Sequence, residues 1–284
     1  MSERKIFACS YEGNYTCIGN RMKNSDREAL RRFRDEGNLF GIVTTRDGFE
    51  AMANMGEYEE EYDFLVCSTG GCVIYRSPLG EPLGAQTRLH TDTANPYFLT
   101  ELYTLFESVG MSGMSADVAF RGGKAEAERF ANEYDPAKNV GCLTHHWHGG
   151  GDYFYRPVNK EALSFVTPFS QCRGYFKNAV AAKGLAGEIC RRYNGWLRAY
   201  AEGSSVAVVP ANVTKGGGLA RFAEFAGVSP ENVWTFGDRD EDVSMLTPFR
   251  GITREGSPEK MIRAAEFVTS SVREALEIAL NNGK

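Results

Sequence analysis

The carboxylates with the clearest potential for chemistry follow a short apolar segment near the C-terminal end of the chain. Residues 233–236 run into Gly237, and Asp238, Asp240 and Asp242 come directly after it. Oxygen ligands of this kind suit Mg²⁺, which keeps several waters and leaves room for a substrate phosphate. The alternative is that one aspartate caps a helix while the others are solvated acids of its first turn.

Three further segments place polar groups where short apolar segments end. Lys215 enters a helical pattern through the glycines at 216–218, where backbone amides and a fixed ammonium would suit a phosphate. Hydroxyls and an arginine at 44–46 end a second apolar segment, and Ser10 and Glu12 end the first one. Such groups at four strand ends are what a phosphoryl-transfer site at the carboxyl edge of a parallel sheet would require.

These four segments, in this order, resemble the motifs of the haloacid dehalogenase superfamily of phosphatases, and specifically its Cof-type branch. In that family the first strand ends in Asp-x-Asp-Gly-Thr and the second in Thr or Ser before Gly-Arg. A Lys-Gly pair and a Gly-Asp-x-x-x-Asp segment follow. The corresponding residues here are 10–14, 44–46, 215–216 and 237–242; the last two segments match in full, and the first departs strongly.

The resemblance implies catalytic positions at Ser10, Glu12, Thr44 and Lys215. In the family the first aspartate attacks phosphorus and forms an acyl phosphate that water cleaves. Ser10 stands at that position, and a hydroxyl neither attacks readily without a base nor binds Mg²⁺ as well as a carboxylate does. Glu12 stands at the position of the general acid and base, one methylene longer. Thr44 would bind the transferring phosphoryl group, and Lys215 would neutralise its charge.

The resemblance also implies a Mg²⁺ site at Asp238 and Asp242, with Ser10 and Glu12 as further metal positions. We expect Ser10 to weaken this binding. Asp242 would orient either Lys215 or a metal-bound water.

Five other residues are candidates for contact with the phosphate or the rest of the substrate. They are Asn14, Thr45, Arg46, Gly70 and Gly71. The first three lie in the motif loops, and the two glycines belong to a turn that resembles the family's Asn-Gly turn. That turn would touch the substrate or only redirect the chain.

Two functional interpretations follow from this pattern. The first is a Mg²⁺-dependent phosphatase of a small phosphorylated metabolite, such as a sugar phosphate, with weak or altered activity because Ser10 replaces the nucleophile. The second is a protein of the same architecture, a pseudo-phosphatase, that binds the phosphorylated ligand without turning it over.

Short strands that alternate with helices predict an α/β fold with a Rossmann-like parallel sheet. Strands are expected at residues 5–10, 39–44, 63–68 and 233–236, and helices at 25–36, 49–55, 218–226, 257–265 and 272–281. The intervening part reads as a separate α+β unit, with helices at 96–110 and 124–133 and strands at 152–156, 161–166 and 206–209. The resemblance implies that this unit is an inserted cap domain. We expect core segments at 1–83 and 209–284 and the cap at 84–208.

Composition narrows the class of protein. The chain has 284 residues and a net charge of −5, which argues against a nucleic-acid partner. Its seven cysteines form no Cys-x-x-Cys pair, and no long apolar run or leader pattern is present, so we expect a cytoplasmic protein with reduced thiols and no membrane partner.

His145, His146 and His148 could contact substrate or, as the weaker alternative, bind a transition metal.

Overall fold

The computed structural model describes residues 3–11, 24–48, 51, 62–76, 86–120, 142–146, 153–157 and 166–282. The chain divides into two compact units. Unit 1 comprises Met1–His90 and Thr214–Lys284, and unit 2 comprises Thr91–Val213. The identification of the middle part of the chain as a cap domain, with boundaries after residues 83 and 208, stays a prediction.

An eight-stranded sheet in the order β14-β13-β12-β1-β2-β3-β4-β5 forms the centre of unit 1. Neighbouring strands from β14 to β3 pair in parallel, and β4 pairs antiparallel with β3. The strands are β1 (Ile6–Ser10), β2 (Leu39–Val43), β3 (Phe64–Cys67), β4 (Cys72–Arg76), β5 (Gln86–Thr91), β12 (Val233–Phe236), β13 (Arg250–Arg254) and β14 (Phe267–Thr269). This largely parallel sheet confirms the predicted α/β class.

The helices described in unit 1 pack on its sheet, and the one that begins at Lys215 has recognisable capping chemistry at both ends. They are α1 (Asn24–Asp35), α6 (Lys215–Ala226), α7 (Val243–Leu246), α8 (Glu259–Ala264) and α9 (Val272–Asn281), with short 3₁₀ turns η2 (Ser68–Gly70), η4 (Pro230–Asn232) and η5 (Asp240–Asp242). The hydroxyl of Thr214 accepts a hydrogen bond from Gly217 N at 3.0 Å and so caps α6. Gly227, with φ +66°, ends that helix in the left-handed conformation.

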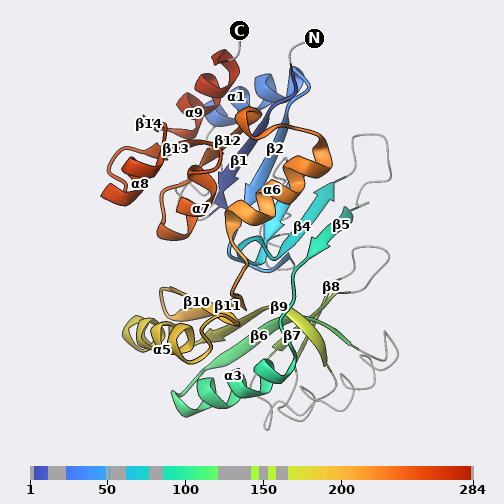
Figure 1. Ribbon diagram of the computed structural model, residues 1–284, viewed down its shortest axis with the longest axis vertical. Helices are drawn as coiled ribbons and strands as arrows, with labels where there is room; N and C mark the ends of the chain where they lie inside the picture. Colours follow the sequence, from blue (N-terminus) through green and yellow to red (C-terminus); the bar gives the residue numbers. More distant parts are fainter. Residues whose placement is uncertain are drawn as a thin grey trace. The chain divides into compact units, whose positions relative to one another are not determined.

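Helices cover both faces of this sheet. Ile6 and Ala8 belong to a core cluster that includes Phe222 of α6. The intervening Phe7 faces the other way and makes an edge contact with Phe33 of α1, with ring centroids 6.0 Å apart. Helices α1 and α9 lie side by side in Figure 1. Because successive side chains point to opposite faces, burial on both faces explains why β1 is apolar from Ile6 to Cys9.

Unit 2 contains a six-stranded sheet in the order β10-β11-β9-β6-β7-β8, in which β6 and β7 are parallel and the other neighbours antiparallel. Its elements are α3 (Tyr97–Ser108), β6 (Gly113–Phe120), β7 (Cys142–His146), β8 (Tyr153–Pro157), β9 (Val166–Tyr175), α5 (Ala179–Arg192), β10 (Leu197–Glu202) and β11 (Ser205–Pro210). Side chains of α3 and α5 share one apolar core with β6, β9 and β11. The two helices lie on the same side of the sheet in Figure 1.

The secondary structure agrees with the expected elements unevenly. Helix 96–110 and strands 152–156 and 206–209 correspond to α3, β8 and β11, whereas β6, β7, α5, β10 and most of β9 were not predicted. The expected helices at 49–55 and 124–133 lie largely or wholly outside the described residues.

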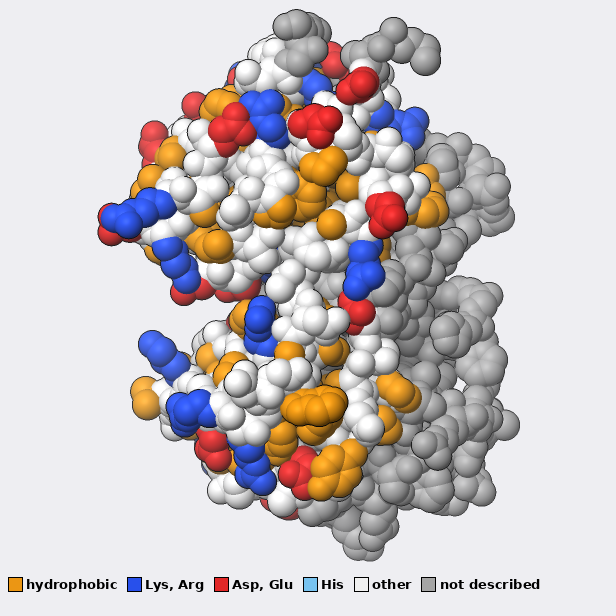
Figure 2. All heavy atoms as spheres, viewed as in Figure 1, with side chains coloured by type: hydrophobic (Ala, Val, Ile, Leu, Met, Phe, Trp, Pro, Cys, Tyr) orange, Lys and Arg blue, Asp and Glu red, His pale blue; other side chains and the backbone are white. Residues whose placement is uncertain are grey.

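Charged side chains of both signs are mixed over the face shown in Figure 2, and no broad basic surface is visible there. Within the described part of the chain, no helix is long and apolar enough to cross a membrane.

Candidate functional site

Three of the four predicted strand-end segments lie at one edge of the unit 1 sheet. In the parallel register, Ser10 is paired with Val43, and Cys9 with Phe236. Ser10, Thr44 and Gly237 therefore come at the carboxyl ends of adjacent strands, where ligands of open α/β sheets usually bind. The fourth segment reaches the same edge through the side chain of Lys215.

Lys215 is the central charge of this edge. Its Nζ donates to Ser10 Oγ at 3.2 Å and to Asp242 Oδ1 at 2.7 Å. All three side chains are fully buried, so the Lys215–Asp242 pair is a buried ion pair that is screened far less than a surface pair. The Lys215 ammonium donates its hydrogen bond to Ser10 Oγ, so it cannot at the same time accept the hydroxyl proton of Ser10.

Asp242 holds the loop that follows β12 as well as Lys215. Its Oδ2 accepts hydrogen bonds from the backbone amides of Asp238 at 3.1 Å and Arg239 at 3.0 Å. Both carboxylate oxygens therefore have protein partners. Of the two roles expected for Asp242, this arrangement favours orienting Lys215 over holding a metal.

Glycines on either side of the ion pair allow its elements to approach each other closely. A Cβ on Gly216 would lie 1.9 Å from the carbonyl oxygen of Ser244, and one on Gly237 would lie 2.6 Å from Asp242 Cβ. No side chain fits at these distances. The Lys-Gly and Gly-Asp pairs are thus explained by backbone packing around the site.

Thr44 is tied into the site by its backbone and its hydroxyl. Its amide donates to Val66 O at 2.8 Å, and its carbonyl accepts from Thr69 N at 3.1 Å. Its Oγ1 accepts from Arg46 N at 3.1 Å, and Thr44 and Thr45 are fully buried. This bonding fixes the loop after β2 against the end of β3.

The turn after β3 is strained and packs against the start of α6. Ser68 and Thr69 have φ +50° and +60°, values that residues with a side chain rarely adopt. A Cβ on Gly70 would lie 1.9 Å from Thr214 O, and one on Gly218 would lie 2.6 Å from Gly70 O. Gly70 is therefore required for packing, whether or not it touches a ligand.

Two hydroxyls of this turn are further candidates for ligand contact. Ser68 Oγ and Thr69 Oγ1 are buried and have no hydrogen-bond partner among the described residues. A buried polar atom without a partner is costly and needs an explanation. Ser68 was missed in the sequence because its left-handed backbone depends on tertiary packing.

Arg46 and Gly71 lie beside this turn. The guanidinium of Arg46 is 5.4 Å from the ring centroid of Tyr11, and the carbonyl of Arg46 accepts from Ser68 N at 2.6 Å. Gly71 N donates to Ser68 O at 3.0 Å and closes the turn. These contacts give Arg46 a loop-fixing role and leave its contact with substrate a prediction.

Comparison with known proteins assigns this fold. Residues 154–276 match the family model described as haloacid dehalogenase-like hydrolase. A haloacid dehalogenase-like hydrolase from Bacteroides thetaiotaomicron superimposes with a TM-score of 0.69 at 18% identity, covering 97% of this chain and 99% of that one. A HAD/COF-like hydrolase from Plasmodium vivax gives a TM-score of 0.70 at 13% identity, covering 99% and 96%. This chain has the haloacid dehalogenase fold.

The resemblance inferred from the four motifs is thus confirmed by the family model and the fold. A third similar structure, from a study of phosphatases of the haloalkanoate superfamily in Bacteroides thetaiotaomicron, has a TM-score of 0.68 at 17% identity and covers 97% of this chain and 95% of that one. No curated protein matches the chain in sequence.

The haloacid dehalogenase motifs imply Mg²⁺, and the described residues provide part of a site for it. Asp238 is half-buried after β12, while Asp242 is occupied by Lys215 and backbone amides. Within the described ranges, no group of three His, Cys, Asp or Glu side chains is placed to hold a metal. Glu12 and Asn14 lie outside those ranges. Among the described carboxylates, Asp238 is therefore the best candidate for a cation ligand. A complete site would also need the carboxylate of Glu12.

The histidine segment lies in unit 2, around the end of β7. His145 and His146 belong to β7, and Trp147 and His148 lie outside the described residues. The proposed roles of these histidines stay predictions.

Proposed function

We propose that unit 1 binds the phosphate group of a small phosphorylated metabolite, such as a sugar phosphate, and hydrolyses it weakly at most. The observation that carries this proposal is the hydrogen bond from Lys215 Nζ to Ser10 Oγ at 3.2 Å. The Lys215 ammonium, which would bind phosphate, is in place at this edge. The residue at the nucleophile position, Ser10, carries an uncharged hydroxyl. No nucleic acid or membrane is expected as a partner.

Weak hydrolysis follows from the chemistry of Ser10. A serine hydroxyl needs an adjacent base to attack phosphorus, and its described partner is the donor Lys215. A serine phosphate, once formed, would also be far less labile than an acyl phosphate. The first half-reaction is therefore slow, and the second would stall.

The serine at position 10, in place of the family's aspartate, also favours phosphate binding. Replacing a carboxylate with a hydroxyl removes one negative charge beside Lys215, so a phosphate dianion is repelled less in this low-dielectric setting. Lys215 would pair with a phosphate oxygen, and the buried hydroxyl of Thr44 would donate a hydrogen bond to another. Asp242 would keep the ammonium aimed at the sheet edge.

Mg²⁺ would be held chiefly by Asp238 and Glu12, with Ser10 as a weak ligand. When bound, the ion would supply charge neutralisation at the phosphate. The loss of a carboxylate at position 10 makes its binding weaker than in a relative with aspartate there.

A residual phosphatase activity is the second candidate, because Thr44, Lys215 and Asp242 are retained and Lys215 is hydrogen-bonded to Asp242. In that case Glu12 would activate a water directly. Hydrolysis would then depend on Glu12 and on Mg²⁺ at Asp238.

The deciding experiment measures phosphate release and ligand binding on the same compounds, a panel of sugar phosphates and nucleoside monophosphates with Mg²⁺ or with EDTA. We expect binding by calorimetry with little or no release. Mg²⁺-dependent release that is lost in Asp238→Asn would support the residual phosphatase. The matched control is Asp240→Asn, since Asp240 is an exposed aspartate of the same segment that pairs with Lys260 at the surface. Absence of both binding and release across the panel would refute the proposal.

A further inference from the structure

Unit 2 contains a pocket of about 280 Å³. Its lining comes from three stretches of the unit: residues 93–95 with Phe98, residues 195–196, and residues 210–212. Backbone hydrogen bonds fix these stretches: Ala94 exchanges two with Phe169, and Ala211 N donates to Trp196 O at 3.0 Å. The volume lies just below the lower end of about 300–1,000 Å³ that is usual for ligand pockets, so the pocket has room for one ring.

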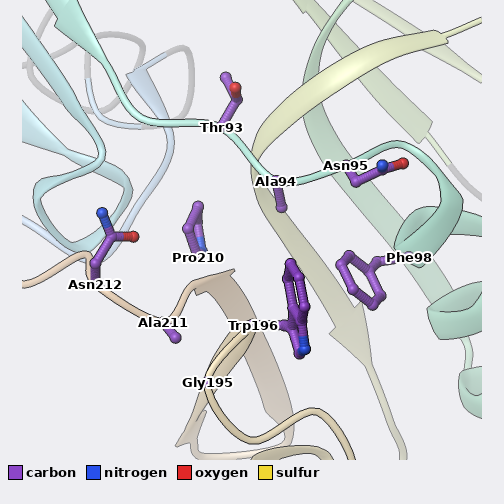
Figure 3. Close-up of a pocket in the computed structure, with 9 residues that line it drawn as sticks. All are labelled: Thr93, Ala94, Asn95, Phe98, Gly195, Trp196, Pro210, Ala211 and Asn212. Carbon is purple, nitrogen blue, oxygen red and sulfur yellow. The ribbon is translucent and has the colours of Figure 1, made fainter.

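An exposed tryptophan forms one wall of this pocket. Trp196 is 68% exposed although it is large and apolar. Its ring centroid lies 6.2 Å from that of Phe98, which in turn makes an edge contact with Tyr193 at 5.6 Å. In Figure 3 the indole lies between Phe98 and Pro210. This support holds a flat aromatic face in place, which lowers the entropy cost of stacking a ligand on it.

Several polar groups of the lining have spare hydrogen-bonding capacity. The side chains of Thr93 and Asn212 and the indole N–H of Trp196 make no hydrogen bond with the described residues, and all three are exposed. Asn95 uses its Oδ1 to accept from Tyr97 N at 2.9 Å, which leaves its NH₂ group available. In Figure 3 the Asn212 amide lies beside Pro210, whereas the side chains of Thr93 and Asn95 point away from Trp196.

No charged side chain belongs to the nine described residues of this lining. The pocket therefore offers nothing to neutralise a phosphate or carboxylate, and it differs in chemistry from the Lys215 edge of unit 1. Its groups instead match a neutral ring that has an apolar C–H face and several hydroxyls. A planar nucleobase would use the aromatic face but fewer of the separate donors and acceptors.

We propose that this pocket binds a neutral sugar ring, which stacks on Trp196 and hydrogen-bonds to polar groups of the lining, Asn212 among them. The proposal does not rest on the phosphate-binding function proposed for unit 1. The sugar is identified by its chemistry alone, an uncharged pyranose or furanose.

The test titrates the full-length protein with unphosphorylated glucose, galactose and mannose, followed by ligand-observed NMR and calorimetry. We expect at least one sugar to bind with a dissociation constant of about 1 mM or below. Trp196→Ala should weaken this binding about tenfold or more, and Trp196→Phe should weaken it less because a smaller aromatic face remains. Asn212→Ala should weaken it through loss of a hydrogen-bonding group.

Tyr97→Ala is the matched control, because Tyr97 is an exposed aromatic residue of α3, next to Phe98, that does not line the pocket. It should leave sugar binding unchanged. Trp196 is mostly exposed, so its variants should keep the circular dichroism and melting temperature of the parent protein. Failure of all three sugars to bind the parent protein would overturn the proposal. Equal binding by Trp196→Ala, or binding of adenosine or uridine in place of the sugars, would overturn it too.

Discussion

Lys215 Nζ lies 2.7 Å from Asp242 Oδ1, and neither side chain is exposed to solvent. A buried ion pair gains its attraction at the expense of desolvating both charges, so its partners depend on each other. The position of the ammonium at the sheet edge is thus coupled to the stability of unit 1.

Asp242→Asn should therefore destabilise the protein by roughly 3–5 kcal/mol, because it leaves a buried ammonium without its counter-charge. Chemical denaturation measures this loss. Asp240→Asn removes an exposed partner and should cost no more than about 1 kcal/mol. The double variant Lys215→Met, Asp242→Leu should recover part of the loss; if Asp242→Asn alone proved as stable as the parent, the ion pair would have no structural role.

Ser10→Asp should raise phosphate release by about 100-fold or more, because it restores a charged nucleophile beside an assembled set of electrostatic groups. The activity assay uses the sugar phosphate that binds the parent protein. Ser10→Asn, similar in size but uncharged, is the control and should show no gain. An inactive Ser10→Asp variant that still bound the ligand would mean that more than the nucleophile is missing.

The parent protein should bind its phosphorylated ligand in EDTA almost as well as in Mg²⁺, whereas Ser10→Asp should bind it much better with Mg²⁺. The reason is the extra negative charge of the variant, which repels a phosphate until a cation neutralises it. Calorimetric titration of both proteins with and without Mg²⁺ gives the comparison. The same Mg²⁺ dependence in both would contradict the charge argument.

Gly70→Ala should destabilise unit 1 by about 2 kcal/mol or more, because the new Cβ would meet Thr214 O at 1.9 Å and the residue has φ +106°. Gly37→Ala is the matched control. Gly37 has φ +83° but no atom within 4 Å of the new Cβ, so its cost should be about 1 kcal/mol from the backbone alone. Equal losses for both variants in thermal melts would show that the contact with α6 does not matter.

Alkaline pH should destabilise the protein partly through Cys172. Burial raises the pKa of this thiol well above its ordinary value of 9.0. Above that value the unfolded chain ionises the thiol while the folded chain does not, so stability is lost as pH rises, by about 1.4 kcal/mol per pH unit at most. Denaturation of the parent and of Cys172→Ala at pH 8 and at pH 10 separates this effect. The variant should lose less stability between the two conditions, and an identical loss would exclude the thiol as a source.

Local sequence patterns predicted the helices and strands of unit 1 better than those of unit 2. β1, β2, β3, β12, α1 and α9 were expected within about two residues of their observed bounds. In unit 2, α5 was missed because Gly184 and Gly187 interrupt its helical pattern. β9 was missed because polar residues such as Ser170, Gln171 and Arg173 interrupt its apolar pattern, although all three are buried.

The chain by itself determined the α/β class, the four polar strand ends and the presence of serine where the family has its nucleophile. These are local properties, since apolar periodicity, a glycine or a side-chain type can be read without knowing what lies nearby. Only the tertiary structure decided that Asp242 serves Lys215, that Gly70 is pressed against Thr214, and that Phe98 and Trp196 share a pocket. Each of these pairs is far apart in sequence, and packing alone brings its members together.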